Sequence, residues 1–497
     1  MSTRFIEQVL KNSLLYPDKP ALITSAGQLT YGCLAEHIKK AACWLQDQGI
    51  KPSDRIMVQA GASTVYVTNY LAVQYLGAVV IPVDRNAVVD TVLHIHEELS
   101  ASLFLGESQD FEGLSFFRDG KDAWNYHNSN EVSLYHPQSD NALSDLLFTT
   151  GTTGKSKGVM LSHRAILGSI SNVRNGAGMT SEDVLLIPVP LNHSFGLREL
   201  RTALYLGASV VLMNGFAFAA ALKKSIKENH CTCMTCVPAA IRVLYQQSKG
   251  KLHDILGELR YIEFCTAPLD LAMKQILLEQ LPDTVLFNSY GSTESAGAIY
   301  LNFSKDREKL LSIGRTAAGV QVNVLDELNH PIPNPTREHP GRLAVSGPMN
   351  MTGYWDAPDL TKETLQDGWV YTNDIAYLDE DGFIYLLGRA NDVINVGGKK
   401  VSPVELENAA ILYPLKECCC MAAEDPKGIL GSVPVLFVVS DTPVNTAELK
   451  DFLSQKLESY KLPAAIIQLE EIPKNYMGKT DRNALKNLYT ESQKHSS

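Results

Sequence analysis

The sequence predicts an α/β protein with a large amino-terminal body of mostly parallel sheets, a β-rich subdomain and a small α+β domain at the carboxyl end. Three observations support this prediction. Strand-like apolar runs alternate with amphipathic helical runs through most of the chain, shorter strands with Pro and Gly turns begin near 314–347, and a further boundary falls near 388–392. We therefore expect domains at 1–387 and 388–497, joined by a hinge.

The alternation of strands and helices is clear in the first half of the chain. The runs V-V-I-P-V at 79–83 and S-V-V-L-M at 209–213 are typical of buried strands. The apolar spacing of Ile38 and 41–45 is typical of a helix instead. Strands of this kind between helical segments predict parallel sheets covered by helices.

The last hundred residues have an α+β pattern. Ser402 as N-cap, Pro403 at the first helical position and Glu405 three residues after the cap predict the start of a helix. The segment 433–439 is typical of a strand. We expect one apolar helical face to be made of Leu449, Phe452, Leu453 and Leu457.

Composition excludes several classes of protein. The chain has 497 residues and a net charge of −11 without a cluster of Lys and Arg, which argues against a nucleic-acid surface. Its nine cysteines are odd in number and three are consecutive, unlike a secreted disulfide framework. The longest apolar stretch, 70–83, is too short to span a bilayer, and the first residues lack the apolar core of a signal peptide. We expect a cytoplasmic protein without a transmembrane segment.

A Thr- and Gly-rich stretch, T-T-G-T-T-G-K-S-K-G at 149–158, follows a strand-like segment and has the composition of a phosphate-binding loop. Its G-K-S resembles the end of a Walker A motif, but that motif requires glycine where this chain has Thr149. A Walker loop also leads directly into a helix, whereas here we expect the helix to start at Ser162. We therefore predict another kind of phosphate loop, in which hydroxyls and backbone N–H groups donate to phosphate and Lys157 is the better cation. A solvated turn is the alternative.

Six further blocks follow this loop in a fixed order. The seven are T-T-G-T-T-G-K-S-K-G (149–158), P-L-N-H-S-F-G (190–196), T-A-P-L (266–269), Y-G-S-T-E (290–294), Y-T-N-D (371–374), G-R-A-N-D-V-I-N-V-G-G (388–398) and P-K-N-Y-M-G-K-T-D-R (473–482). Together they resemble the adenylate-forming superfamily of acyl- and aryl-CoA synthetases, peptide-synthetase adenylation domains and beetle luciferases. Four positions depart from its pattern: Ser156 replaces Pro, Asn192 replaces an aromatic residue, Asn373 replaces Gly, and Asn391 replaces Asp or Lys. Asn373 puts the backbone geometry before Asp374 in question, because Gly adopts positive φ more freely.

The resemblance implies an acid–thiol ligase that uses ATP, Mg²⁺ and CoA. A small carboxylic acid would become an acyl-adenylate with release of pyrophosphate, and the acyl group would then pass to CoA. Lys479 would bridge the carboxylate and the α-phosphate, Thr293 would contact the α-phosphate, and Glu294 would hold Mg²⁺. The ATP- or AMP-binding residues implied are Thr149, Thr150, Gly151, Thr152, Thr153, Gly154, Lys157, Thr266, Ala267, Pro268, Tyr290, Gly291, Asp374 and Arg389. Within this set Tyr290 would face adenine, and Asp374 would accept hydrogen bonds from the ribose.

The resemblance also implies an acyl pocket, a hinge and a channel for CoA. The pocket would involve His193, Phe195 and Gly196, although a structural role for His193 is an alternative. Asn391 would be the hinge, and Gly397 and Gly398 would line the CoA tunnel. No Asp occurs between 188 and 207, which favours an acid without an α-amino group.

Several alternatives stay open at this point. The acid could be a fatty, aryl or short-chain acid. The acceptor could be the phosphopantetheine arm of a carrier protein instead of CoA, and a non-catalytic nucleotide-binding relative is a further alternative. Luciferase-like oxidation has no separate support. His230 with Cys231, Cys233 and Cys236 suggests zinc, but no second ligand pair follows at finger-like spacing, and 418–420 are expected to be packing residues.

Overall fold

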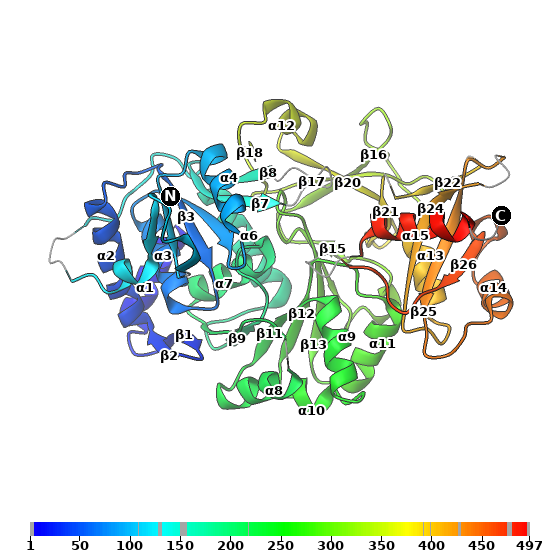
Figure 1. Cartoon of the computed structure of the whole chain (residues 1–497), viewed down its shortest axis with the longest axis horizontal. Coiled ribbons are helices and arrows are strands. Elements are labelled where there is room, and N and C mark those ends of the chain that lie inside the picture. Colours follow the sequence, from blue (N-terminus) through cyan, green and yellow to red (C-terminus); the bar gives the residue numbers. More distant parts are fainter. Residues whose placement is uncertain are drawn as a thin grey trace.

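The computed structural model describes residues 4–107, 109–127, 132–149, 157–216, 218–390, 392–397, 399–425, 429–474 and 480–494. Figure 1 shows the chain passing from a blue amino-terminal lobe at the left, through a green central lobe, to an orange and red carboxyl-terminal lobe at the right. The yellow-green strands above the centre lie between the outer lobes. This arrangement confirms the predicted fold class.

The helices lie in all three lobes, and one short helix, α12, accompanies the strands of the antiparallel β-rich region. Their bounds are α1 (Phe5–Leu15), α2 (Tyr31–Asp47), α3 (Thr64–Tyr75), α4 (Val89–Leu99), α5 (Gly120–Trp124), α6 (His163–Ala177), α7 (Ser194–Leu206), α8 (Ala219–Glu228), α9 (Pro238–Gln247), α10 (His253–Leu256), α11 (Leu271–Gln280), α12 (Pro358–Thr364), α13 (Pro403–Ala410), α14 (Thr446–Ser454) and α15 (Arg482–Lys494).

The larger of the two mostly parallel sheets runs through the central lobe. From edge to edge its strands are β15 (Arg315–Thr316), β14 (Ile299–Asn302), β13 (Val285–Tyr290), β12 (Tyr261–Phe264), β11 (Cys233–Cys236), β9 (Val184–Ile187), β10 (Ser209–Leu212), β1 (Pro20–Thr24) and β2 (Gly27–Thr30). The strands from β13 to β1 are parallel. Antiparallel strands extend both edges.

The second mostly parallel sheet belongs to the amino-terminal lobe. Its order is β18 (Gly353–Tyr354), β8 (Lys157–Ser162), β7 (Leu143–Thr149), β4 (Val79–Asp84), β3 (Arg55–Ala60), β5 (Leu103–Gly106) and β6 (Phe117–Asp119). The strands from β7 to β6 are parallel, and β8 and β18 are antiparallel additions. The two strands expected at 79–83 and 209–213 are therefore both present.

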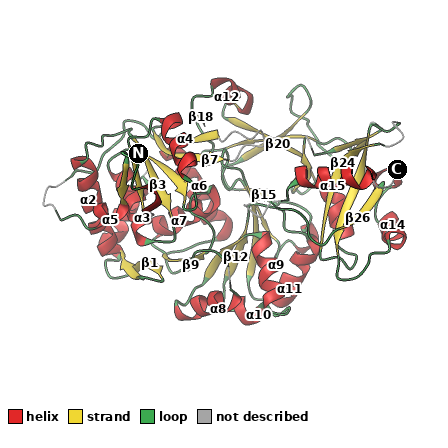
Figure 2. Ribbon diagram, viewed as in Figure 1, coloured by secondary structure: helices red, strands yellow, loops and turns green. Residues whose placement is uncertain are grey.

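Alternate side chains of these strands enter different cores. Leu185 and Ile187 of β9 join the main core with helices α1, α2, α3, α6 and α7, whereas Leu186 between them joins the core on the other face. Val80 of β4 also joins the main core, while Val79 and Ile81 face away from it. This alternation with a period of two is what helices on both faces of a sheet require (Figure 2).

The β-rich subdomain is an antiparallel sheet. Its strands are β16 (Gln321–Leu325), β17 (Gly341–Ser346), β20 (Trp369–Leu378), β19 (Leu365–Gln366) and β21 (Ile384–Arg389). Within the region noted near 314–347, β16 and β17 thus belong to a sheet that continues to Arg389, whereas β15 belongs to the central sheet. The domain boundary between 387 and 388 stays a prediction, and β21 extends two residues beyond it.

The carboxyl-terminal lobe contains a hairpin and a small sheet. The hairpin is β22 (Ile394–Val396) with β23 (Lys399–Val401), and the sheet is β24 (Glu417–Glu424), β25 (Ser432–Val439) and β26 (Ala465–Gln468). The helix predicted at Ser402 begins at Pro403, with the Ser402 hydroxyl accepting from the Glu405 N–H at 3.1 Å. Leu449 and Leu453 are buried on α14 as expected, but that helix ends at Ser454, so Leu457 packs from the following turn.

An ion pair between described residues joins the β-rich subdomain to the carboxyl-terminal lobe. Arg337, between β16 and β17, contacts the carboxylate of Glu405 on α13. The same Glu405 oxygen accepts from Lys461 Nζ at 2.9 Å. Glu405 therefore contacts Arg337 of the β-rich subdomain and Lys461 of its own lobe through the same carboxylate oxygen.

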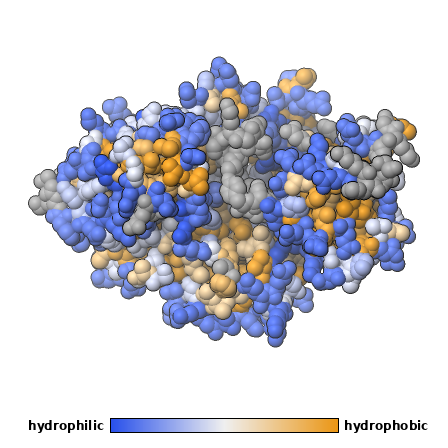
Figure 3. Space-filling view, in the orientation of Figure 1, coloured by the Kyte–Doolittle hydropathy of each residue, from blue (hydrophilic) through white to orange (hydrophobic). Residues whose placement is uncertain are grey.

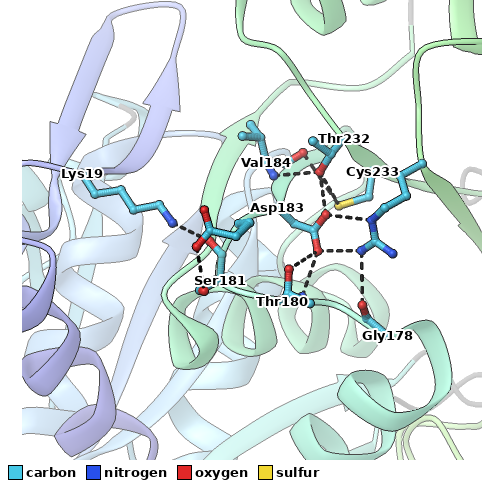
Figure 4. A network of polar contacts seen from close by, with 10 residues as sticks. Lys19, Gly178, Thr180, Ser181, Asp183, Val184, Thr232 and Cys233 are labelled. Carbon is cyan, nitrogen blue, oxygen red and sulfur yellow. Dashed lines mark hydrogen bonds and ion pairs between the residues drawn. The ribbon is translucent and has the colours of Figure 1, made fainter.

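A polar network joins the amino-terminal ends of β9, β11 and β12 (Figure 4). Oδ2 of Asp183 accepts from Arg260 Nη2 at 2.6 Å and from the Thr180 N–H at 2.8 Å. Oδ1 accepts from Thr232 Oγ1 at 2.8 Å and from Arg260 Nε at 3.1 Å. Burial acts to raise the pKa of Asp183, but these donors outweigh burial and hold that pKa below its usual value. Both carboxylate oxygens are therefore fully engaged.

The face of the molecule drawn in Figure 3 is mostly hydrophilic. Apolar side chains gather on it left of the centre and over the carboxyl-terminal lobe at the right. Among the described residues, no helix has the length and apolar character needed to cross a membrane.

Candidate active site

Three of the sequence blocks lie at the carboxyl ends of parallel strands in the central sheet. The segment 190–196 follows β9, 266–269 follows β12, and 290–294 is the end of β13 with the turn after it. Ligands of open α/β sheets bind at this edge. The topology therefore brings three separate blocks toward one region.

The strand before the Thr- and Gly-rich loop pairs with the strand after it. Thr149 of β7 is opposite Lys157 of β8, and β8 continues to Ser162. The Ser162 hydroxyl then caps α6 by accepting from the Ala165 N–H at 3.1 Å. The predicted helix start at Ser162 is thus confirmed, and the loop does not lead directly into a helix as a Walker loop would. The residues predicted between, Thr150, Gly151, Thr152, Thr153 and Gly154, lie outside the described residues.

Lys157 and Glu294 share a neighbour, Tyr354 of β18. The Tyr354 hydroxyl donates to Glu294 Oε1 at 2.7 Å, and Lys157 Nζ lies 5.5 Å from the centre of the Tyr354 ring. Burial raises the pKa of Tyr354, so its hydroxyl remains a donor. Tyr354 was not predicted from the sequence, because its segment M-T-G-Y belongs to none of the seven blocks.

Glu294 fits the chemistry proposed for a magnesium ligand. Tyr354 occupies one carboxylate oxygen, and a carboxylate has a second oxygen that suits a hard cation. The described residues contain no cluster of three His, Cys, Asp or Glu side chains that could hold a metal. Magnesium beside Glu294 would therefore take most of its ligands from phosphates and water, as it commonly does in nucleotide sites.

Tyr290 and Asp374 are brought together by hydrogen bonding between two sheets. The Tyr290 hydroxyl donates to Asp374 Oδ2 at 2.5 Å, and Asp374 is opposite Arg389 where β20 pairs with β21. Burial raises the pKa of Asp374, while the Tyr290 hydroxyl and the charge of Arg389 act in the opposite direction. The Tyr290 ring also packs against the core of the β-rich subdomain. Both packing and nucleotide contact are compatible with this position.

Asn373 does not adopt the positive φ that its replacement of glycine put in question. It lies within β20 and is not among the residues with positive φ. Its carbonyl accepts from the Ala390 N–H at 2.7 Å, next to Arg389. The asparagine therefore lies in β20 at the point where the pairing with β17 shifts register, between Tyr371 and Ile375.

The turn after β12 contains a strained residue. Thr266 has φ of +80°, in a region that a β-branched side chain rarely adopts. Such a residue costs about 1–3 kcal/mol, and the surrounding structure must hold it in place. Thr266, Ala267 and Pro268 are all exposed, so the turn is accessible to a ligand.

The predicted acyl-pocket residues lie at the start of α7. His193 is the residue before the helix, Phe195 is buried in its first turn, and Gly196 packs against the loop that precedes it. A Cβ on Gly196 would lie 2.4 Å from the carbonyl oxygen of Pro190, so the close approach requires glycine. Asn192 donates to Asp84 Oδ2 at 3.2 Å, which links this loop to the end of β4.

The predicted hinge and catalytic lysine, Asn391 and Lys479, lie outside the described residues, as does Gly398. Their surroundings are described. Arg482 Nε lies 3.5 Å from Asp392 Oδ2, and Arg482 Nη1 donates to the Cys420 carbonyl at 2.9 Å. Lys474 and Thr480 form a backbone bridge at the base of the segment that carries Lys479. The Arg482 side chain, two residues after Thr480, therefore links the end of this segment to the residue after the predicted hinge.

The cysteine groups have separate structural environments. Cys233 of β11 belongs to the main core, whereas Cys231 and Cys236 belong to the core on the other face of the sheet. Burial raises the pKa of Cys231 to about 12 and raises the pKa values of Cys233 and Cys236 as well, which disfavours the thiolate form that binds zinc. Cys419 and Cys420 likewise enter opposite cores of the carboxyl-terminal sheet.

Comparison with known proteins matches residues 11–355 to the model of the AMP-binding enzyme family and residues 405–479 to the model of its C-terminal domain. The 2-succinylbenzoate–CoA ligase of Bacillus velezensis is 30% identical, with 97% of each chain covered. The medium-chain fatty-acid–CoA ligase of Escherichia coli is 28% identical, covering 95% of this chain and 88% of the relative. The solved structure of o-succinylbenzoate CoA synthetase from Bacillus subtilis with its acyl-adenylate intermediate superposes with a TM-score of 0.84 and 26% identity, covering 96% of this chain and 97% of the other. The chain belongs to the AMP-binding enzyme family.

Proposed function

We propose that this protein is an AMP-forming acid–thiol ligase that activates a carboxylic acid with ATP and transfers the acyl group to CoA. The observation that carries the proposal is the hydrogen bond from Tyr290 of Y-G-S-T-E to Asp374 of the β-rich subdomain. It joins two blocks that are far apart in sequence and supplies an aromatic ring and a carboxylate, which suit adenine and ribose. Relatives along the whole chain are CoA ligases, which supports the same activity here.

The first step forms an acyl-adenylate. A carboxylate oxygen of the acid bonds to the α-phosphorus of ATP, and the bond from this phosphorus to pyrophosphate breaks. Lys157 and the loop before it would hold the departing phosphates, while Thr293 and Lys479 would stabilise charge at the α-phosphate. Magnesium held by Glu294 would neutralise phosphate charge when bound. Asp374, with Arg389 beside it, would orient the ribose.

The second step transfers the acyl group. The sulfur of CoA bonds to the acyl carbon, and the bond from this carbon to AMP breaks. We propose that the carboxyl-terminal lobe turns at Asn391 between the steps, so that Gly397 and Gly398 line the path of the pantetheine chain. Gly397 is exposed, has φ of +58°, and would bring a Cβ to 3.0 Å from Leu430. A side chain at Gly397 would therefore meet both strain and crowding.

The acid and the cellular setting are part of the proposal. The acid would occupy a pocket beside His193, Phe195 and Gly196, in a cytoplasmic enzyme. A carrier protein is the alternative acceptor. A non-catalytic nucleotide-binding role is the alternative activity.

A screen of carboxylic acids tests the function. Purified protein with ATP and Mg²⁺ is assayed for pyrophosphate release over fatty, aryl and short-chain acids, with and without CoA, and thioesters are identified by mass spectrometry. We expect at least one acid to give pyrophosphate and an acyl-CoA. Pyrophosphate exchange without a CoA thioester would favour a carrier protein, and no exchange with any acid would favour the non-catalytic role.

A further inference from the structure

A buried ionic cluster includes the two residues of α7 that follow shortly after the predicted acyl-pocket residues. Its charged members are Arg198 and Glu199 of α7 and Glu263 of β12, with exposed fractions of 2%, 0% and 0%. Arg198 begins two residues after Gly196, and its guanidinium lies 5.2 Å from the centre of the Phe195 ring. The cluster is therefore continuous with the residues proposed to hold the acyl group.

Every member of the cluster is close in sequence to a predicted site residue. Glu263 precedes Thr266 by three positions, Ser289 directly precedes Tyr290, and Gly297 follows Glu294 by three positions. A Cβ on Gly297, which has φ of +65°, would lie 2.6 Å from Arg198 Nη1. The cluster thus lies where α7 meets the loops that leave β12 and β13.

The hydrogen bonds within the cluster use only part of its polar groups. Arg198 Nε donates to Glu199 Oε1 at 2.9 Å, and Arg198 Nη2 donates to Glu263 Oε1 at 2.5 Å. Ser289 Oγ also donates to Glu263 Oε1, at 2.6 Å. Both carboxyl groups are consequently engaged through one oxygen each.

Several buried polar atoms of this region have no hydrogen-bond partner among the described residues. They include Glu199 Oε2, Glu263 Oε2, the hydroxyl oxygen of Tyr300, and Thr235 Oγ1, which is opposite Glu263 where β11 pairs with β12. A Cβ on Gly297 would lie 2.9 Å from the Tyr300 hydroxyl, which places this hydroxyl beside the same glycine as Arg198 Nη1. Buried polar groups without partners are rare because each loses its hydration without compensation.

Two other buried carboxylates among the described residues have both oxygens engaged. One turn further along α7, Arg201 contacts Asp145, whose two oxygens also accept from Tyr70, Gln74 and Ser144. At the opposite end of β12, both oxygens of Asp183 are engaged by Arg260 and its neighbours. Neither Asp145 nor Asp183 has a carboxylate oxygen without a hydrogen-bond partner, in contrast to Glu199 and Glu263.

The charge of the cluster favours a neutral or donating partner over an anion. The cluster has two carboxyl groups and one guanidinium. Burial, with the neighbouring Glu263 as a second cause, raises the pKa of Glu199 to about 8, so Glu199 is mostly protonated at neutral pH. The Arg198 charge is then matched by Glu263, whose second oxygen remains an acceptor.

We propose that this cluster recognises a hydrogen-bond-donating group, a hydroxyl or an amine, at the far end of the acid that the enzyme activates. The inference rests on the proposed function, because it assigns the substrate class of that same site. The specificity-determining residues would be Glu263, Glu199 and Tyr300, with Arg198 positioning both carboxyl groups. Arg198 is five residues along α7 from His193, about 7.5 Å by helix geometry, which suits an aryl or medium-length acid.

The proposal excludes two other kinds of acid as preferred substrates. A plain alkyl or aryl end would leave the same polar atoms buried without partners, and sites built to bond a hydroxyl reject analogues that lack it. A second carboxylate at the far end would face the unpaired Glu263 oxygen, and like charges that are buried together repel strongly.

The test compares matched acids with the intact protein, ATP and Mg²⁺. Within one series of aryl acids, the distal substituent is a hydroxyl, an amine, a methyl or a carboxylate, and kcat/KM is measured by pyrophosphate release. We expect the hydroxyl or amine to exceed the methyl by about 10- to 100-fold, as expected for a bond to a charged group. A ratio near one, or preference for the methyl or the carboxylate, would overturn the proposal. If no acid gives pyrophosphate release, the proposed ligase activity itself is contradicted, and the inference about the acid falls with it.

Variants locate the selectivity. Glu263→Gln should bring the ratio toward one, and Tyr300→Phe should lower it severalfold without disturbing folding, because the Tyr300 hydroxyl has no partner to lose. Asp183→Asn is the matched control, since it changes a buried carboxylate paired with arginine at the other end of the same strands. An unchanged ratio in Tyr300→Phe and Glu263→Gln, or an equal change in Asp183→Asn, would overturn the assignment.

Discussion

The Tyr290 hydroxyl donates to Asp374 Oδ2 at 2.5 Å and so joins β13 of the central sheet to β20 of the antiparallel sheet. The two residues are eighty-four positions apart. We predict that Tyr290→Phe raises the KM for ATP about tenfold, because Asp374 loses the donor that orients its carboxylate. Steady-state pyrophosphate release over a range of ATP concentrations measures this effect.

A matched control for that variant is present in the same antiparallel sheet. The Tyr385 hydroxyl donates to Asp379 Oδ2 at 3.1 Å, away from the predicted nucleotide residues. Tyr385→Phe should leave the KM for ATP unchanged. Equal values of KM in the two variants would contradict a nucleotide role for the Tyr290–Asp374 pair.

Tyr354 should control the use of magnesium through Glu294. Its hydroxyl donates to Glu294 Oε1 at 2.7 Å, and removing such an orienting bond commonly weakens metal binding about 10- to 100-fold. We predict that Tyr354→Phe needs a higher Mg²⁺ concentration for half-maximal pyrophosphate release, and that EDTA abolishes release in both proteins. Identical Mg²⁺ titrations for Tyr354→Phe and the wild-type protein would contradict a role for Glu294 in binding the metal.

The two half-reactions should depend on different residues of the carboxyl-terminal lobe. We predict that Lys479→Ala lowers acyl-adenylate formation by about 10²–10³-fold while sparing attack of CoA on supplied acyl-adenylate. Gly398→Leu should block thioester formation while adenylation survives, because a side chain would obstruct the pantetheine path. Rapid-quench measurement of each step distinguishes them, and equal loss of both steps in Lys479→Ala would remove its proposed role.

Arg482 should position the segment that carries Lys479. It contacts Asp392, next to the predicted hinge, and donates to the Cys420 carbonyl of β24. We predict that Arg482→Ala slows adenylation about tenfold without changing the KM for CoA, because the loss of a charged hydrogen bond loosens the start of α15. Lys486→Ala, an exposed position on the same helix, is the control, and the same slowing there would refute the idea.

The stability of the carboxyl-terminal lobe should depend on the ionisation of Glu407. Glu407 Oε1 accepts from the Cys420 N–H at 2.7 Å, and burial raises the pKa of Glu407 from 4.5 to about 7. Because the folded-state pKa is the higher one, the protonated carboxyl favours folding below pH 4.5, and this contribution is lost as the pH rises to about 7. At pH 8 the loss is at most about 3 kcal/mol.

Glu407→Gln should remove this pH dependence, since an amide keeps an acceptor oxygen and never ionises. We expect the Tm of the variant minus that of the wild-type protein to increase between pH 5 and pH 8. A difference that is constant over this range would mean that Glu407 does not titrate with the shifted value.

The sequence predicts the fold well where local patterns decide it. The cap at Ser402, the strand at 433–439 and the helix start at Ser162 depend on neighbouring residues, and all three are confirmed. Tyr354 and the Arg198 cluster could not be predicted in this way. A hydrogen bond between β18 and a turn after β13, or between α7 and β12, depends on how sheets assemble, and no periodicity or motif marks it.

Thr266 has a consequence for how nucleotide would bind. Its φ of +80° belongs to the folded chain, and the surrounding structure offsets the conformational cost of about 1–3 kcal/mol. A nucleotide that binds at this exposed turn would not need to change the backbone conformation, so its affinity would not be lowered by that change. The packing around β12 thus contributes to nucleotide affinity indirectly, because it holds the turn in its conformation through residues that do not contact the ligand.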